Sequence, residues 1–174
     1  MPELIYKERL QPSLLDRLTD EAPDSRQESR TRRVMSSAQL RHSVLRDLSW
    51  LLNAVHMEAL VDLEALPLVQ KSVLNFGMPN LAGRTLSGLS LASVADQLRE
   101  AIVLYEPRLL PDTVHVQVER AEGHNSVSFH IEAVLWSQPL PLQLFLRTDI
   151  DLEDGEVRVT DQSGAGGERM RAEE

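Results

Sequence analysis

The 174-residue sequence contains no cysteine, and aromatic residues make up only 4% of it. The absence of cysteine excludes disulfide bonds and thiolate metal sites, and it favours a reducing compartment. With so few aromatic rings, the core has to be built mainly from Leu, Val, Ile and Ala. The hydrophobic content of 42% is typical of a folded protein, and the length suits a single domain.

Long apolar runs are also missing. No stretch approaches the ~20 apolar residues that a membrane helix needs, and Met1 to Leu4 lacks the apolar region of a signal peptide. We therefore expect a protein that stays where it is made and does not insert directly into a membrane. The net charge of −9 would repel a phosphate backbone, so no nucleic-acid partner is expected. The basic stretch from Arg26 to Arg33 is either a solvated linker or an electrostatic docking strip.

Catalytic motifs are scarce. The sequence has neither a G-x-S-x-G elbow nor a glycine-rich phosphate loop. Three of its five histidines lie on the faces of expected strands or in a turn, so we expect no metal site and no cofactor. Glu58, Asp62 and Glu64 are interpreted as the solvated end of a helix, whereas a glycosidase needs two carboxylates that face each other. We therefore expect no catalytic residues. The alternative hypothesis is that the protein is an enzyme, a cell-wall glycosidase.

The first 33 residues are predicted to form an N-terminal arm. Residues 12–18 indicate a short helix with Leu14, Leu15 and Leu18 on one face. A polar stretch over residues 20–33 follows as a linker, so the arm should dock separately from the body. Residues 34–160 are expected to form one α+β domain, and the glycine-rich residues 161–174 a disordered tail.

Three helices are expected at the start of the domain. Ser36 and Gln39 form a capping-box pattern before an apolar stripe of Val44, Leu48, Leu51 and Val55. Trp50 lies off the centre of this stripe, either as a packing residue at the edge of the core or as a partner contact.

The second and third helices are expected further along the chain. Pro67 suits the first turn of the second helix, which should run through Leu74 and end at Asn75 and Gly77 in left-handed conformations. The third is expected from about Ser93 to Tyr105.

After the third helix, the spacing of apolar residues changes from the 3.6-residue period of a helix to the two-residue period of a strand. Alternating residues predict strands at 114–118 and 127–135 that form an antiparallel hairpin. Residues 140–146 alternate as well, but Pro139 and Pro141 favour an edge or peripheral strand. A last short strand is expected at 157–159. The pattern indicates an α+β fold with N-terminal helices followed by a small antiparallel sheet packed against them.

The third helix stops at Glu106-Pro107-Arg108. The proline has a restricted φ, lacks an amide donor and pushes Glu106 out of the helical region. The corner therefore places an acid and a guanidinium on either side of a rigid bend. Two interpretations remain open: an internal ion pair that clamps the helix end to the sheet, or a charged surface that docks to another protein.

Three segments, in order, carry a family resemblance: residues 45–53, residues 72–83 and the corner with its preceding residues 102–105. Together with residues 12–18, they resemble TssE, the baseplate subunit of type VI secretion systems, which is related to a small wedge protein of contractile phage tails. The resemblance covers roughly residues 8–150. Phe76 and Met78 stand where the family more often has tyrosine and leucine, and both substitutions keep an apolar side chain.

The resemblance implies a noncatalytic structural protein. Its partners would be the wedge subunits TssF, TssG and TssK and the contractile sheath, for whose assembly it would act as a template. Its location would be cytoplasmic, at the baseplate docked on the inner membrane. The residues expected to bind partners are Glu106, Pro107, Arg108, Leu14, Leu15, Leu18 and Trp50.

Overall fold

The computed structural model describes residues 13–19, 35–83, 90–119, 126–137 and 140–162. The predicted linker and the tail from residue 163 onwards lie outside these ranges. The helices are α1 (Leu14–Leu18), α2 (Ser37–Asn53), α3 (Pro67–Gln70) and α4 (Leu91–Tyr105), with short 3-10 turns η2 (Met57–Ala59), η3 (Val73–Asn75) and η5 (Pro111–Thr113). The strands are β1 (His115–Glu119), β2 (Ser126–Leu135), β3 (Leu142–Asp151) and β4 (Val157–Asp161).

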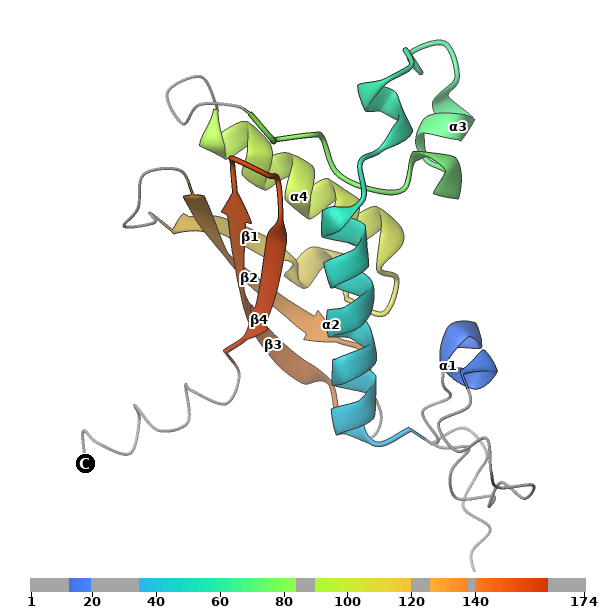
Figure 1. Ribbon diagram of the computed structural model, residues 1–174. Helices are drawn as coiled ribbons and strands as arrows, with labels where there is room; N and C mark the ends of the chain where they lie inside the picture. The colour runs from blue at the N-terminus through green and yellow to red at the C-terminus, as the bar shows by residue number, and fades with distance from the viewer. Residues whose placement is uncertain (1–12, 20–34, 84–89, 120–125, 138–139, 163–174) are drawn as a thin grey trace, which may run out of the picture.

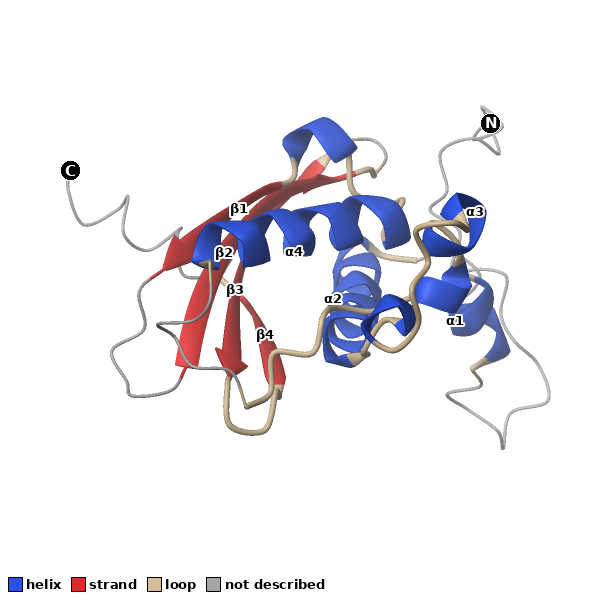
Figure 2. Ribbon diagram, turned by 90° about the horizontal axis from the view of Figure 1, so that it is seen from above, coloured by secondary structure: helices blue, strands red, loops and turns tan. Residues whose placement is uncertain are grey.

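The four strands form one sheet in the order β1-β2-β3-β4, and every neighbouring pair is antiparallel. Figure 1 shows α2 and α4 against the sheet, and Figure 2 shows both helices on the same side of it. The predicted α+β fold, with helices first and a covered antiparallel sheet after them, is confirmed. In the part of the chain that the structure describes, no helix is long and apolar enough to cross a membrane.

The prediction of an edge strand at residues 140–146 was wrong. Strand β3 lies inside the sheet and pairs with β2 on one side and with β4 on the other. It begins at Leu142, after both prolines, so no ladder hydrogen bond is lost to proline. Leu140 precedes the strand and is 72% exposed.

Helix α2 begins as predicted. The main-chain N–H of Ser36 donates to Gln39 Oε1 (2.9 Å), and that of Gln39 donates to Ser36 Oγ (3.2 Å), which completes the capping box. Its stripe packs into the core, where Val44 and Leu48 are fully buried. Val55 lies beyond the end of the helix and is 53% exposed, so the stripe ends at Leu52.

Helix α3 starts at Pro67 and α4 ends at Tyr105, as predicted, but the opposite end of each helix differs from the prediction. Helix α3 stops at Gln70, and η3 follows after a turn. Helix α4 begins at Leu91, with Ser90 as its N-cap. Gly77 has a φ of +132°, whereas no described residue other than glycine has a positive φ, so Asn75 is not left-handed. Its side chain has a different role, described below.

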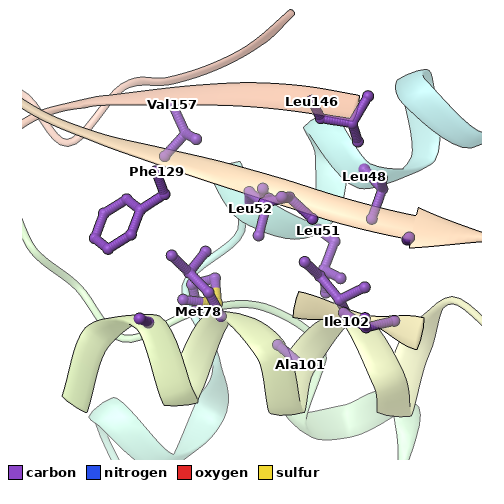
Figure 3. Close-up of a cluster of buried hydrophobic side chains, with 14 of the residues drawn as sticks. Leu48, Leu51, Leu52, Met78, Ala101, Ile102, Phe129, Leu146 and Val157 are labelled. Carbon is purple, nitrogen blue, oxygen red and sulfur yellow. The ribbon is translucent and has the colours of Figure 1, made fainter. Parts of the chain in front are cut away.

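The core lies between the sheet and the two long helices. Alternate residues of β2 and β3, such as Phe129 and Leu146, point toward α2 and α4 and meet Leu48 and Ile102 (Figure 3). The core is thus aliphatic with one buried phenylalanine, as the composition predicts. The opposite face of the sheet carries polar residues such as Glu132 and Arg147, which are only partly buried.

Candidate functional site

The Glu-Pro-Arg corner closes on itself through a two-pronged ion pair. Helix α4 ends at Tyr105, and the main-chain N–H of Glu106 still donates to Ile102 O (2.9 Å). The Glu106 carboxylate is almost fully buried. It accepts hydrogen bonds from Arg108 Nε at Oε1 (2.6 Å) and from Arg108 Nη2 at Oε2 (2.5 Å). Pro107 forms the bend between them and lies on the surface.

Arg108 also ties the corner to α2. Its Nη1 donates to Ser43 Oγ (2.7 Å) and its Nη2 to Asp47 Oδ2 (2.6 Å). Burial alone would lower the pKa of Arg108, but the hydrogen bonds and negative charges of Glu106 and Asp47 raise it above the ordinary arginine value. The guanidinium is therefore charged at every physiological pH. Its planar fork suits this set of acceptors, which a lysine would not match.

The ion pairs continue from α2 to α1. Arg46 Nε donates to Asp47 Oδ1 (2.9 Å), and Arg46 Nη1 donates to Asp16 Oδ1 (2.7 Å). The Arg46 guanidinium also lies 5.2 Å from the ring centre of Trp50, a cation–π distance. An ionic chain therefore runs from Glu106 through Arg108, Asp47 and Arg46 to Asp16, and it joins three segments far apart in the sequence.

Asp16 receives bonds from two sides. The Ser13 hydroxyl donates to Asp16 Oδ2 (2.6 Å), as part of the α1 capping box, while Arg46 binds Oδ1. Desolvation would raise the pKa of Asp16, but the hydrogen bonds from Ser13 and Arg46 and the charge of Arg46 hold it below the ordinary value. The carboxylate is thus charged at neutral pH, which keeps α1 paired with α2.

The structure separates the residues that we expected to bind partners. Glu106 is buried at the corner, Pro107 is exposed, and the Arg108 side chain keeps 23% of its surface accessible. The internal ion pair of one interpretation is present, but it ties the end of α4 to α2 and not to the sheet. Whether the corner also docks to a partner stays a prediction.

The expected α1 surface is more open. Helix α1 buries none of its residues: Leu14 is 71%, Leu15 40% and Leu18 74% exposed. Trp50 on α2 is 52% exposed. These apolar side chains are therefore accessible on the surface, and their contact with a partner stays a prediction.

Sequence reasoning missed Ser43, Arg46, Asp47 and Asp16 as members of the site. Ser43 and Asp47 are four residues apart, so they share one face of α2. The segment 45–53 stood out as unusually specific, and it contains Arg46 and Asp47. Nothing in the local pattern shows, however, that Arg108 reaches Asp47 from a position 61 residues away.

The β4 edge of the sheet is covered by α2. Asn53 Nδ2 donates to Val157 O (2.8 Å), and Asn53 Oδ1 accepts from Val157 N (3.0 Å), so one side chain takes the place of a neighbouring strand. At the other end of α2, Arg41 donates to Asp161 Oδ2 (3.4 Å) and to Gln143 O (3.1 Å). Both ends of this edge are therefore occupied.

The β1 edge is different. Among the described residues, a side chain covers the approach to this edge, where Arg99 Nε of α4 donates to Val114 O (3.1 Å). Main-chain groups alternate sides along an antiparallel strand, and β2 uses Val134 and Trp136 to bond toward the β1 side. In this register His115, Gln117 and Glu119 face β2, so Val116 and Val118 direct their N–H and C=O groups outward. No strand among the described residues pairs with that side.

Glu58 lies in the 3-10 turn η2, and Asp62 and Glu64 lie in the loop after it, so these carboxylates are solvated as predicted but do not end a long helix. Glu58 accepts a hydrogen bond from Gln70 Nε2 (2.8 Å), and Asp62 Oδ1 accepts from the main chain of Glu64 (2.9 Å). All three acids are exposed. Within the ranges that the structure covers, no group of His, Asp and Glu is arranged to hold a metal ion.

The fold and the site define a small α+β protein with internally paired charges, exposed apolar side chains and one open sheet edge. Residues 38–140 match the family model of the baseplate wedge protein gp25. Because this match spans more than half of the chain, the protein belongs to that family, and its role in a baseplate is structural. A search of curated proteins found no match.

Proposed function

We propose that this protein is the noncatalytic TssE-type subunit of a type VI secretion baseplate. It joins the wedge subunits TssF, TssG and TssK and acts as a template for the first ring of the contractile sheath. The family match over residues 38–140 supports the baseplate part. The resemblance of residues 12–18, 45–53, 72–83 and the corner supports the secretion-system part. No observation favours the glycosidase alternative, and we do not propose it.

The observation that carries the template role is the open edge of β1. An exposed edge is normally a liability that proteins cover or charge. Here the β4 edge is covered by Asn53 and Arg41, whereas Val116 and Val118 present outward main-chain groups. We infer that an extended segment of a sheath subunit adds to β1, with main-chain hydrogen bonds as the source of affinity.

The wedge subunits meet a different part of the molecule in this proposal. Leu14, Leu15 and Leu18 of α1 offer an apolar helical face of the kind that docks into a groove. Trp50 extends this apolar surface on α2, which the ionic chain connects to α1. At the corner, the exposed Pro107 and the accessible part of Arg108 form the contact, while buried Glu106 holds Arg108 in place.

The proposed location follows from these partners: the cytoplasmic side of the inner membrane, within the docked baseplate. The experiment is deletion of the gene in cells whose sheath subunit carries a fluorescent label. We expect assembled sheaths to disappear and to return when the wild-type gene is restored. Normal numbers of sheaths in the deletion strain would contradict the proposal.

A further inference from the structure

Residues 55–78 form a projection between α2 and α4, which we call the lobe; it extends away from the sheet (Figure 1). Its two ends are clamped together by a bridge between Val55 and Met78. Met78 N donates to Ala54 O (2.7 Å), and His56 N donates to Met78 O (3.0 Å). Gly77 allows this approach, because a Cβ atom there would lie 2.4 Å from Ala54 O. The lobe is therefore a closed loop with a defined base.

Polar groups hold the interior of the lobe. Asn75 is 6% exposed. Its Oδ1 accepts from Glu58 N (2.9 Å), and its Nδ2 donates to Gln70 O (3.0 Å). The Tyr105 hydroxyl donates to Ser72 O (3.0 Å), which anchors the lobe to the end of α4. These bonds between polar groups help to set the shape of the lobe's backbone.

The large apolar side chains of the lobe face outward instead. Leu63 is fully buried, but Leu60 is 85%, Leu68 is 87% and Val73 is 80% exposed. About half of the exposed large apolar residues in the described part of the chain lie in this lobe. Isolated exposed leucines need no explanation, but such a concentration marks an interaction surface. Because the lobe already has its shape, binding costs little ordering entropy.

The charges of the lobe indicate what covers it. Its exposed charged residues are three acids, Glu58, Asp62 and Glu64, and one base, Lys71. A second copy of this chain would bring the same acids together, in a molecule whose net charge is already −9. An anionic lipid surface would also be repelled. An apolar protein surface bordered by lysine or arginine is complementary to both features.

We propose that the lobe is a docking surface for a partner protein with apolar side chains flanked by basic ones. The inference rests on the proposed function, in which that partner is a wedge subunit. It adds a second wedge contact, separate from α1 and the corner. The lobe and the β1 edge then serve different partners.

The test uses purified TssF–TssG complex as the probe and measures its dissociation constant for the full chain. In the lobe variant, Leu68→Ser is combined with Val73→Ser, two exposed positions where substitution costs little stability. The matched control is Leu140→Ser, which removes a leucine of similar exposure outside the lobe (72%). We expect binding to weaken about tenfold or more for the lobe variant, and to stay within about twofold for the control. Glu64→Lys should also weaken binding, because it opposes the basic residues of the partner.

Each other outcome has a definite meaning. If the wild-type chain binds none of TssF, TssG and TssK, the proposed function fails as a whole. If it binds TssF–TssG and the lobe variant binds equally well, the lobe inference is wrong while the proposed function stands. Self-association of the wild-type chain in sedimentation, lost in the lobe variant, would assign the lobe to a second copy and overturn the inference. Binding to anionic vesicles through the lobe would overturn it too.

Discussion

Arg108, which follows α4, donates from Nη2 to Asp47 Oδ2 in the middle of α2 at 2.6 Å, across 61 positions of sequence. The same guanidinium nitrogen bonds the buried carboxylate of Glu106. One arginine therefore joins the end of α4 to the middle of α2, the two helices that cover the sheet. The Glu-Pro-Arg corner is thus part of the fold's architecture, whatever further contact it makes.

The first prediction concerns stability at the corner. Glu106→Ala removes the two carboxylate oxygens that bind Arg108 Nε and Nη2, and it leaves Asp47 as the remaining charged partner of Arg108. Because Arg108 keeps partial access to water, we expect a loss of about 1–3 kcal/mol in the free energy of unfolding. Chemical denaturation measures it. Glu132→Ala on the open face of the sheet is the control, with a change under about 0.5 kcal/mol. Equal stability of the two variants would show that the corner does not clamp the fold.

The second prediction concerns the link between α1 and α2. Asp16 and Arg46 pair at 2.7 Å. A double-mutant cycle with Asp16→Asn and Arg46→Gln should give a coupling of about 0.5–1 kcal/mol. The pair Glu156 and Arg158 is the control, because its side chains are 54% and 75% exposed. Its coupling should lie near zero. A zero value for both pairs would contradict the ionic link.

The third prediction is a pH dependence of α1 docking. The pKa of Asp16 in the folded chain lies below its ordinary value of 3.8. A lowered pKa means that the stabilisation is fully present above pH 3.8 and is lost as the pH falls through the folded value. Protection factors for the amides of residues 16–19, measured by NMR and corrected for the intrinsic pH dependence of exchange, should therefore fall only in strong acid. In Asp16→Asn the protection should be low at every pH, so that exchange runs near its intrinsic rate. Slow exchange in that variant would refute the mechanism.

The fourth prediction concerns the base of the lobe. Gly77→Ala combines a φ of +132° with a contact of 2.4 Å to Ala54 O, so we expect a loss on the order of 2 kcal/mol or more. Gly83→Ala is the control: its φ is +73°, but nothing lies within 4 Å of the added Cβ. It should lose only about 1 kcal/mol. Thermal unfolding compares the two. A Gly77 variant as stable as the Gly83 variant would mean that the base is not tightly closed.

Much of the fold could be predicted because its signals are local. The capping box at Ser36 and the stripe of Val44, Leu48 and Leu51 depend only on neighbours in the same helix. The alternation of apolar and polar residues in β2 is likewise a local signal, because it depends only on neighbours in the same strand. The error at residues 140–146 arose because the strand was started at Leu140, so that Pro141 fell inside it and Pro139 just before it. Both prolines precede Leu142, where the pairing on both sides begins.

The candidate site was less predictable. The corner itself could be recognised, because a proline after a helix is a local signal. Its partners Ser43 and Asp47 could not, since their approach depends on how α2 and α4 pack on the sheet. The same holds for Asn53, whose side chain covers Val157 across 104 positions. Tertiary packing alone decides which sheet edge stays open.

The most direct test of the account compares the two sheet edges in cells. Val118→Pro removes an outward N–H from β1, and Val159→Pro makes the matched change on β4, the edge that α2 covers. Proline at an outward-facing edge position spares the ladder. With both variants shown to be folded, labelled sheaths are counted in strains that carry each as the sole copy. The account predicts few or no sheaths with Val118→Pro and near-normal numbers with Val159→Pro. Normal sheath numbers with Val118→Pro would contradict it.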